Sequence, residues 1–296
     1  MKIKKTKGEQ VFDVFNVILM AIVAAVMILP MLHVLSVSLS EGSESIKGGF
    51  FFYPHGFNLK GYETVFKDPL LIRSYGNTIL YVIGNTVLTL FFTALTAYPL
   101  SIPGFRLKIP VTVFLTITMF ISGGTIPTYM LMRNMGLINS VWVMMLPFCV
   151  GAYNVILFRT FFTGIPAALR EAAIIDGASE VTVLFRIIFP LSKAIFATIG
   201  LFTLVAKWND WFSALIYLNR ETMYPLQMIL RKILFNTDQA MKNLDPVTRQ
   251  MFSGNEVTAQ NVKMAAIIIT TLPILCVYPF IQKYFVKGVF VGTIKG

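Results

Sequence analysis

Six apolar segments, each long enough to cross the hydrocarbon core of a membrane, constrain the fold of this chain more than any other feature. They run over residues 12–39, 74–100, 109–132, 141–163, 194–218 and 262–286. A membrane-spanning helix needs about 20 mostly apolar residues, and a helix satisfies its backbone hydrogen bonds internally. The segments lack the strict alternation of polarity that a transmembrane β-strand requires. We therefore predict an all-α membrane protein with six transmembrane helices.

The composition agrees with that class. Hydrophobic residues make up 56% of the chain and charged residues 13%, and the mean hydropathy is +0.71. Lysines cluster at residues 2–7, as in a signal peptide, but the first apolar segment is too long for a cleaved one and lacks a clear small-residue cleavage site. Cys149 and Cys276 both lie in apolar segments, so we expect neither a disulfide framework nor a metal site.

The distribution of charge predicts the orientation of the six helices. The side with both termini carries thirteen basic and five acidic residues, and the opposite side carries eleven basic and eight acidic ones. Because basic residues are enriched on the cytoplasmic side of membrane proteins, both termini and the 163–193 loop should be cytoplasmic. The isoelectric point near 9.6 therefore indicates membrane topology rather than nucleic-acid binding.

The segments divide the chain into three parts. Residues 1–73 hold an N-terminal cytoplasmic tail, the first transmembrane helix and an outer loop, residues 74–286 form a core with five transmembrane helices, and residues 287–296 form a cytoplasmic tail. In the last outer loop, apolar residues at helical spacing predict a short helix within Met223–Phe235, followed by a polar loop to about residue 260.

The cytoplasmic loop has the signals of two short helices joined by a turn. Pro166 suits the first turn of a helix, Asp176-Gly177 should end that helix, and a second, apolar-faced helix should start at Ala178 and break at Pro190. The small alanines of the first helix would let another protein approach closely. The candidate docking residues are Glu171, Ala172, Ala173, Asp176 and Gly177. The alternative is an ordinary amphipathic loop that packs only on its own helices.

This loop carries a resemblance to a known family. Glu171-Ala172-Ala173, Gly177, Ile187 and Pro190 have the spacing of the signature loop in the membrane subunits of binding-protein-dependent ATP-binding-cassette (ABC) importers. Phe189 stands where leucine is usual. With six spans and the closing residues 287–296, nearly the whole chain resembles the smaller permease subunit of maltose and oligosaccharide transporters.

The resemblance implies a type I ABC importer permease fold, with a cytoplasmic coupling helix that sits in a cleft of the ATPase. It implies a second homologous permease subunit, two ATPase subunits and an extracytoplasmic solute-binding protein as partners, and a place in the bacterial inner membrane. It also implies that residues 291–296 extend toward the ATPase dimer. No cofactor is expected.

A second candidate site is a polar cluster within the fifth apolar segment. It consists of Lys207, Trp208, Asn209, Asp210 and Trp211. The apolar run before the cluster covers only residues 194–206, so the cluster should lie in the outer half of the membrane or at its outer edge. Indole rings can stack on sugars, so the cluster is a candidate substrate pathway. The alternative is an aromatic belt with a structural Lys207–Asp210 ion pair.

Other polar residues at membrane depth, Asn77, Asn85, Thr86 and Asn154, should form interhelical hydrogen bonds. Prolines inside the apolar segments should kink or end helices.

The sequence lacks catalytic motifs, including the phosphate-binding loop of an ATPase. We therefore expect a non-catalytic permease subunit that imports oligosaccharides, acidic sugars included, with ATP hydrolysis on separate subunits. The alternatives are an ion-coupled secondary carrier, in which Lys207 and Asp210 hold the coupling ion, and a membrane scaffold that transports nothing.

Overall fold

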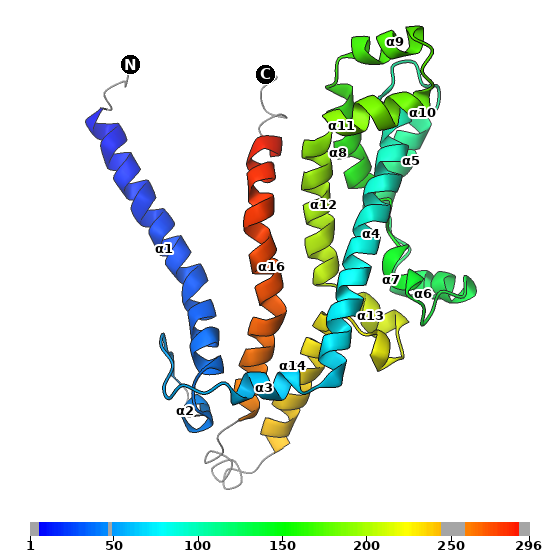
Figure 1. Ribbon diagram of the computed structural model, residues 1–296. Helices are drawn as coiled ribbons and strands as arrows, with labels where there is room; N and C mark the ends of the chain where they lie inside the picture. Colours follow the sequence, from blue (N-terminus) through cyan, green and yellow to red (C-terminus); the bar gives the residue numbers. More distant parts are fainter. Residues whose placement is uncertain (1–5, 47–48, 244–257, 290–296) are drawn as a thin grey trace. The chain divides into compact units, whose positions relative to one another are not determined.

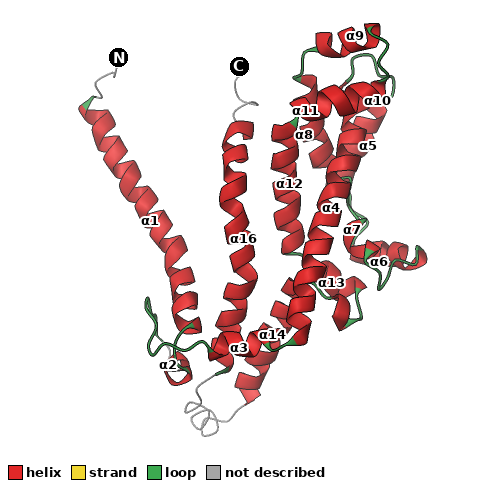
Figure 2. Ribbon diagram, in the orientation of Figure 1, coloured by secondary structure: helices red, strands yellow, loops and turns green. Residues whose placement is uncertain are grey.

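Helices dominate the computed structural model, which describes residues 6–46, 49–243 and 258–289 (Figure 1). Over those residues Figure 2 shows helices joined by loops, and the described chain has no strand beyond one isolated bridge between Ser40 and Phe57. The predicted all-α fold is confirmed. The chain forms two compact units, residues 1–69 with 230–272 and residues 70–229 with 273–296. The predicted division at residues 73 and 286 stays a prediction.

The first unit is built on one long apolar helix. A capping box starts α1, because the Thr6 side chain accepts from the Glu9 N–H and the Glu9 carboxylate accepts from the Thr6 N–H. At the other end, the amide of Asn261 donates to the carbonyls of Val37 and Ser40, both at 2.9 Å. The helices of this unit are α1 Lys7–Ser38, α2 Gly42–Ile46, α3 Lys60–Phe66, most of α14 Leu226–Asn243 and the first part of α16 Ala259–Val289.

The predicted helix within Met223–Phe235 is present as α14, but it continues to Asn243, so residues 236–243 are helical rather than a loop. Residues 244–257 of the predicted polar loop lie outside the described chain.

The second unit is organised around α4, whose inward face mixes polar and apolar residues. Buried along it are Ser74, Thr78, Tyr81, Val82, Asn85, Thr89, Thr93, Ala94, Ala97 and Tyr98. Two hydrophobic clusters pack on this helix, one with α8, α10 and α12, the other with α6, α7, α13 and α14. The helices of this unit are α4 Pro69–Ser101, α5 Lys108–Phe120, α6 Thr125–Asn134, α7 Trp142–Met145, α8 Ala152–Thr163, α9 Ala167–Ile175, α10 Glu180–Val183, α11 Phe189–Leu191, α12 Lys193–Trp208 and α13 Phe212–Tyr217, together with the start of α14 and the last part of α16.

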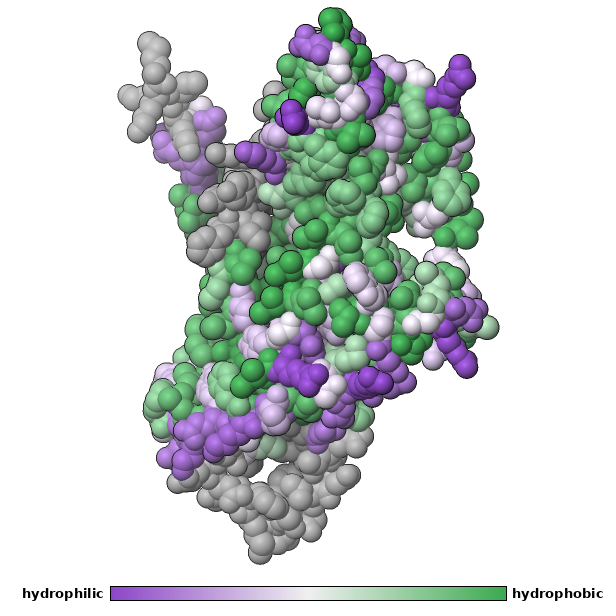
Figure 3. Space-filling view, turned by 45° about the vertical axis from the view of Figure 1, so that its right-hand side comes forward, coloured by the Kyte–Doolittle hydropathy of each residue, from purple (hydrophilic) through white to green (hydrophobic). Residues whose placement is uncertain are grey.

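Within the described residues, three helices are long and apolar enough to cross a membrane alone: α1, α4 and the Ala259–Val277 part of α16. The number rises to six if each of three bent helix pairs counts as one span. Figure 3 shows hydrophobic residues over much of the visible face. The described chain is therefore an integral membrane protein. It has three spans if only continuous helices are counted, and up to six if each bent pair is one span.

The apolar segments 109–132, 141–163 and 194–218 are interrupted rather than continuous helices. In the first of these segments, α5 ends at Phe120, and the axis of α6 is turned by 118° from that of α5. Gly124, with a φ of +83°, provides the turn. With 13 residues, α5 is only about 20 Å long, against about 30 Å of hydrocarbon. At these breaks, loop backbone rather than helix occupies part of each apolar segment.

The second loop helix ends one residue beyond the predicted break at Pro190. It runs from α10 through a π-helical turn, Leu184–Ile188, into α11, and ends at Leu191 before a bend of 79° into α12. In an α-helix, Pro190 would leave the Arg186 carbonyl without its N–H donor. The wider turn shifts the hydrogen bonding, since the Phe189 N–H already bonds to Leu184 five residues back. The proline is therefore accommodated.

Candidate functional site

The first candidate site is α9, whose ends are set by local signals. Pro166 precedes its first residue, and the helix extends for nine residues as the loop pattern predicts. Gly177 takes a φ of +82°. Its N–H bonds to the Ile174 carbonyl and the Ala178 N–H to the Ala173 carbonyl, both at 2.9 Å. This pair of bonds is a Schellman motif, which fixes the direction of the chain beyond the helix.

The outer surface of α9 is open, and Figure 1 shows the helix at the end of the second unit, beside α10. None of its residues is buried. Four of the five predicted docking residues, Glu171, Ala172, Asp176 and Gly177, are exposed, whereas Ala173 packs on the hydrophobic cluster of its own unit. The pattern did not single out Ile175, whose apolar side chain is 85% exposed.

A polar contact ties α9 to two neighbouring helices. The Arg170 guanidinium on α9 pairs with Glu180 on α10, with an Nε to Oε2 distance of 3.1 Å. The Tyr98 hydroxyl, near the end of α4, donates to the same Oε2 at 2.7 Å. The guanidinium lowers the pKa of the Glu180 carboxyl below its ordinary value. No sequence pattern predicted a contact among these three residues, although Arg170 and Glu180 flank the predicted turn with opposite charges.

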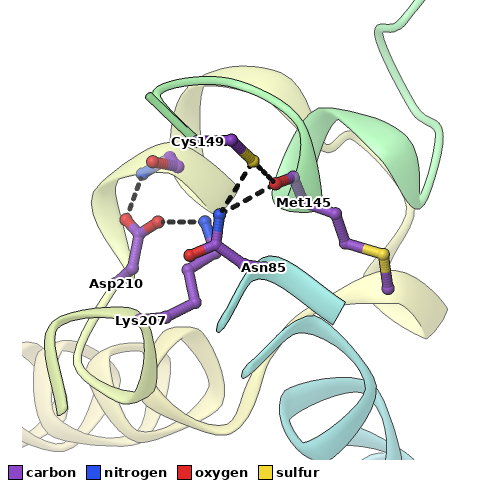
Figure 4. A network of polar contacts seen from close by, with 6 residues as sticks. Asn85, Met145, Cys149, Lys207 and Asp210 are labelled. Atoms are coloured by element: carbon purple, nitrogen blue, oxygen red, sulfur yellow. Dashed lines mark hydrogen bonds and ion pairs between the residues drawn. The ribbon is translucent and has the colours of Figure 1, made fainter. Parts of the chain in front are cut away.

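The second candidate site is the polar cluster, where the helix breaks between α12 and α13. The predicted ion pair is present, with Lys207 Nζ 2.7 Å from Asp210 Oδ2 (Figure 4). The other carboxylate oxygen of Asp210 accepts from the Ser213 N–H at 3.0 Å, so the carboxylate also caps the start of α13. Both charged side chains are largely buried, 11% and 20% exposed.

This ion pair forms part of the wall of a pocket of about 480 Å³. Of the five residues in the cluster, only Lys207 and Asp210 line the pocket. Trp208 is buried, and the Trp211 ring lies edge-on to Phe212 with their centroids 5.6 Å apart. The Asn209 amide donates to the Val205 carbonyl at 2.9 Å. The other lining residues are Asn85, Thr89, Val143, Pro147, Phe148, Asn154, Phe202, Thr203, Ala206, Ser213 and Tyr217.

Another wall of the pocket is the loop between α7 and α8, and α4 satisfies its backbone. Asn85 donates to the Met145 carbonyl at 2.8 Å, and the Cys149 thiol donates to the same oxygen at 2.9 Å (Figure 4). The Thr93 hydroxyl donates to the Cys149 carbonyl at 3.4 Å. The predicted interhelical role of Asn85 is confirmed. The described residues contain no group of histidine, cysteine or acidic side chains able to hold a metal ion.

Broken apolar helices beside a pocket with polar residues in its wall are typical of membrane transport proteins. No protein-family model matches the chain. It is 40% identical to Protein LplC of Bacillus subtilis (strain 168), over 98% of this chain and 97% of that protein. It is 34% identical to the polygalacturonan/rhamnogalacturonan transport system permease protein YtcP of the same organism, over 97% and 99% of the two chains.

Among solved structures, a bacterial ABC transporter involved in the import of the acidic polysaccharide alginate matches with a TM-score of 0.85 and 31% identity. The match covers 96% of this chain and all of that one. The chain therefore belongs to the permease subunits of carbohydrate ABC importers. It is a non-catalytic, multi-pass membrane subunit, and the predicted ABC importer permease fold is confirmed.

Proposed function

We propose that this chain and a second homologous permease subunit form the translocation pathway of an oligosaccharide importer in the bacterial cytoplasmic membrane. An extracytoplasmic solute-binding protein delivers the sugar, and two ATPase subunits supply the energy. Both termini are cytoplasmic in this arrangement. One observation carries the proposal: α9 is exposed, ends in a rigid turn and is tied to α4, as a lever for another protein must be. Residues 291–296, expected near the ATPase, lie outside the described chain.

The coupling surface on α9 consists of Glu171, Ala172, Asp176 and Gly177, with Ala173 holding the helix to its own unit. An ATPase that grips these exposed residues moves α9 as a rigid body, because the Schellman turn and the Arg170–Glu180 pair resist local bending. The motion then reaches α4 through Tyr98.

The proposed substrate pathway runs past the polar cluster. Lys207 and Asp210 line the pocket, whereas Trp208, Asn209 and Trp211 do not. We propose acidic oligosaccharides as the substrate class, because one relative is named for polygalacturonan transport and the matched structure for alginate import. The pocket itself presents one cation and one anion that neutralise each other. Selection of an acidic sugar therefore falls largely to the partner proteins.

The test of this function is reconstitution of the complete transporter in vesicles. We expect uptake of radiolabelled trigalacturonate to require ATP, the solute-binding protein and both permeases. Uptake should persist when an ionophore collapses the ion gradients. The ion-coupled carrier predicts the reverse: uptake by this chain alone, independent of ATP and abolished by the ionophore. A membrane scaffold predicts assembly without uptake.

The contact between α9 and α10 gives a second prediction. Glu180→Gln removes the charge that Arg170 pairs with, so part of the motion of α9 is lost before it reaches α4. Because the pair is partly exposed, we expect a modest effect: uptake per ATP hydrolysed should fall about threefold. Since the pKa of Glu180 is lowered, the pair persists at neutral pH and is lost only as the pH falls through that lowered value.

A matched control is Glu63→Gln, an exposed glutamate on α3 outside the contact. The exchanged pair Arg170→Glu with Glu180→Arg should recover part of the coupling. An unchanged ratio of uptake to hydrolysis in Glu180→Gln would show that α9 acts without this contact.

A further inference from the structure

We infer that Phe148 is a substrate-contacting residue whose ring stacks on a sugar ring in the pocket. The inference rests on the proposed function, because it takes an oligosaccharide as the ligand.

The backbone of Phe148 is in an unfavourable conformation. Its φ is +63°, in the left-handed region, which a bulky side chain rarely adopts. Among the described residues only Asn139 shares this feature outside glycine. Asparagine tolerates the left-handed region. Two hydrogen bonds also hold Asn139: its N–H donates to the Tyr217 carbonyl, and its side-chain oxygen accepts from the Asn219 N–H.

The fold gains little from the phenyl ring that occupies this position. Phe148 is 77% exposed, so contacts within this chain do not offset the backbone strain. A glycine would adopt the same conformation without strain. Strained backbone conformations cost stability and cluster at functional sites. We therefore attribute the phenylalanine at this position to a function of its ring.

The loop holds that ring at the pocket. Residues 146–151 interrupt an apolar segment, and backbone of this kind is tolerated at membrane depth where it lines a cavity. On either side of Phe148, the Met145 carbonyl accepts a bond from Asn85 of α4 (Figure 4), and the Cys149 carbonyl accepts one from Thr93 of α4. The backbone is therefore fixed by a neighbouring helix while Phe148 lines the pocket.

The chemistry around Phe148 suits a sugar. A sugar ring has an apolar face of C–H groups, which stacks on an aromatic ring, and a rim of hydroxyls that need donors and acceptors. Asn154, Thr203 and Asp210 line the same pocket as Phe148 and offer both. A volume of about 480 Å³ lies in the range of small-molecule sites and suits a short stretch of an oligosaccharide.

The test compares Phe148→Gly, Phe148→Ala and Phe148→Tyr in the complete reconstituted transporter, with radiolabelled trigalacturonate and maltotriose as probes. Loss of the ring should raise the KM of uptake about tenfold, while tyrosine should keep it near the wild-type value. Phe148→Gly should also unfold at a temperature equal to or above that of the wild type, because it relieves the strain. A purely structural role predicts the opposite change in stability.

Phe120→Ala is the matched control, since this phenylalanine is 83% exposed but does not line the pocket. If the wild-type complex transports a probe and the Phe148→Gly complex transports it equally well, the inference about Phe148 is overturned and the proposed function is not. Failure of the wild-type complex to transport either probe would overturn the proposed substrate class instead. Loss of the second permease from purified Phe148→Gly complexes would identify the ring as a subunit contact and also overturn the inference.

Discussion

Gly177→Val is expected to abolish most of the uptake and of the ATP hydrolysis that the solute-binding protein stimulates. Gly177 has a φ of +82°, and a non-glycine residue in that region costs about 1–2 kcal/mol, with more for a β-branched side chain. The chain would escape this strain by unwinding the Schellman turn, which frees the carbonyls of Ala173 and Ile174 and reorients α9. A misplaced coupling helix should lower stimulated hydrolysis and uptake by about tenfold or more.

The surroundings of Gly177 make the substitution informative, because an added Cβ meets no atom within 4 Å. The effect of valine is thus conformational rather than a steric clash within this chain. Gly177→Asn is the matched variant, since asparagine tolerates the left-handed region, and it should retain most of the coupling. Gly76→Ala, at another uncrowded glycine, should behave as the wild type. Wild-type stimulation in a Gly177→Val complex that still assembles would show that α9 does not couple hydrolysis to transport.

The parts of the structure that the sequence predicts well are those with local causes. Long apolar runs identify the segments, because the bilayer requires about 20 apolar residues for each helix. The bounds of α9 follow from the fixed φ of Pro166 and the left-handed turn at Gly177, both of which act within a few residues. The Lys207–Asp210 pair was also predicted from its spacing of three residues, although it forms at the end of α12, where Asp210 lies beyond the helix, rather than on one helix face.

The prolines predict kinks or ends within the apolar segments, and Pro147 does lie in the break between α7 and α8, but the course of the loop there depends on contacts far along the chain. The loop after α7 leaves carbonyl groups at Met145 and Cys149, and it is stable because Asn85 and Thr93 on α4 bond to them. No residue pattern within 141–163 indicates that Asn85 and Thr93 are the donors. The conformation of Phe148 is still harder to foresee, since local sterics argue against it. The pocket lining follows from these breaks, so the sequence found only its two charged residues.

The ion pair in the pocket gives the last prediction, which separates a structural role from a transport role. Lys207→Met leaves the Asp210 carboxylate largely buried with no cation beside it, and we expect a loss of about 3 kcal/mol in the stability of the folded chain. Lys207→Met with Asp210→Asn removes both charges and should recover most of that stability, because the amide keeps an oxygen to accept from Ser213.

Unfolding temperature and uptake, measured on the same purified complexes, then distinguish the two roles of the pair. If Lys207 and Asp210 bind sugar hydroxyls, the stable double variant should still show a raised KM for uptake, because it has lost two charged partners for the substrate. If the pair only holds α12 against α13, the double variant should transport normally. Gln227→Met is a suitable control, since the Gln227 amide donates to Asn209 at 3.5 Å and Gln227 does not line the pocket. Because the pair is internally neutral, the raised KM should be similar for trigalacturonate and maltotriose.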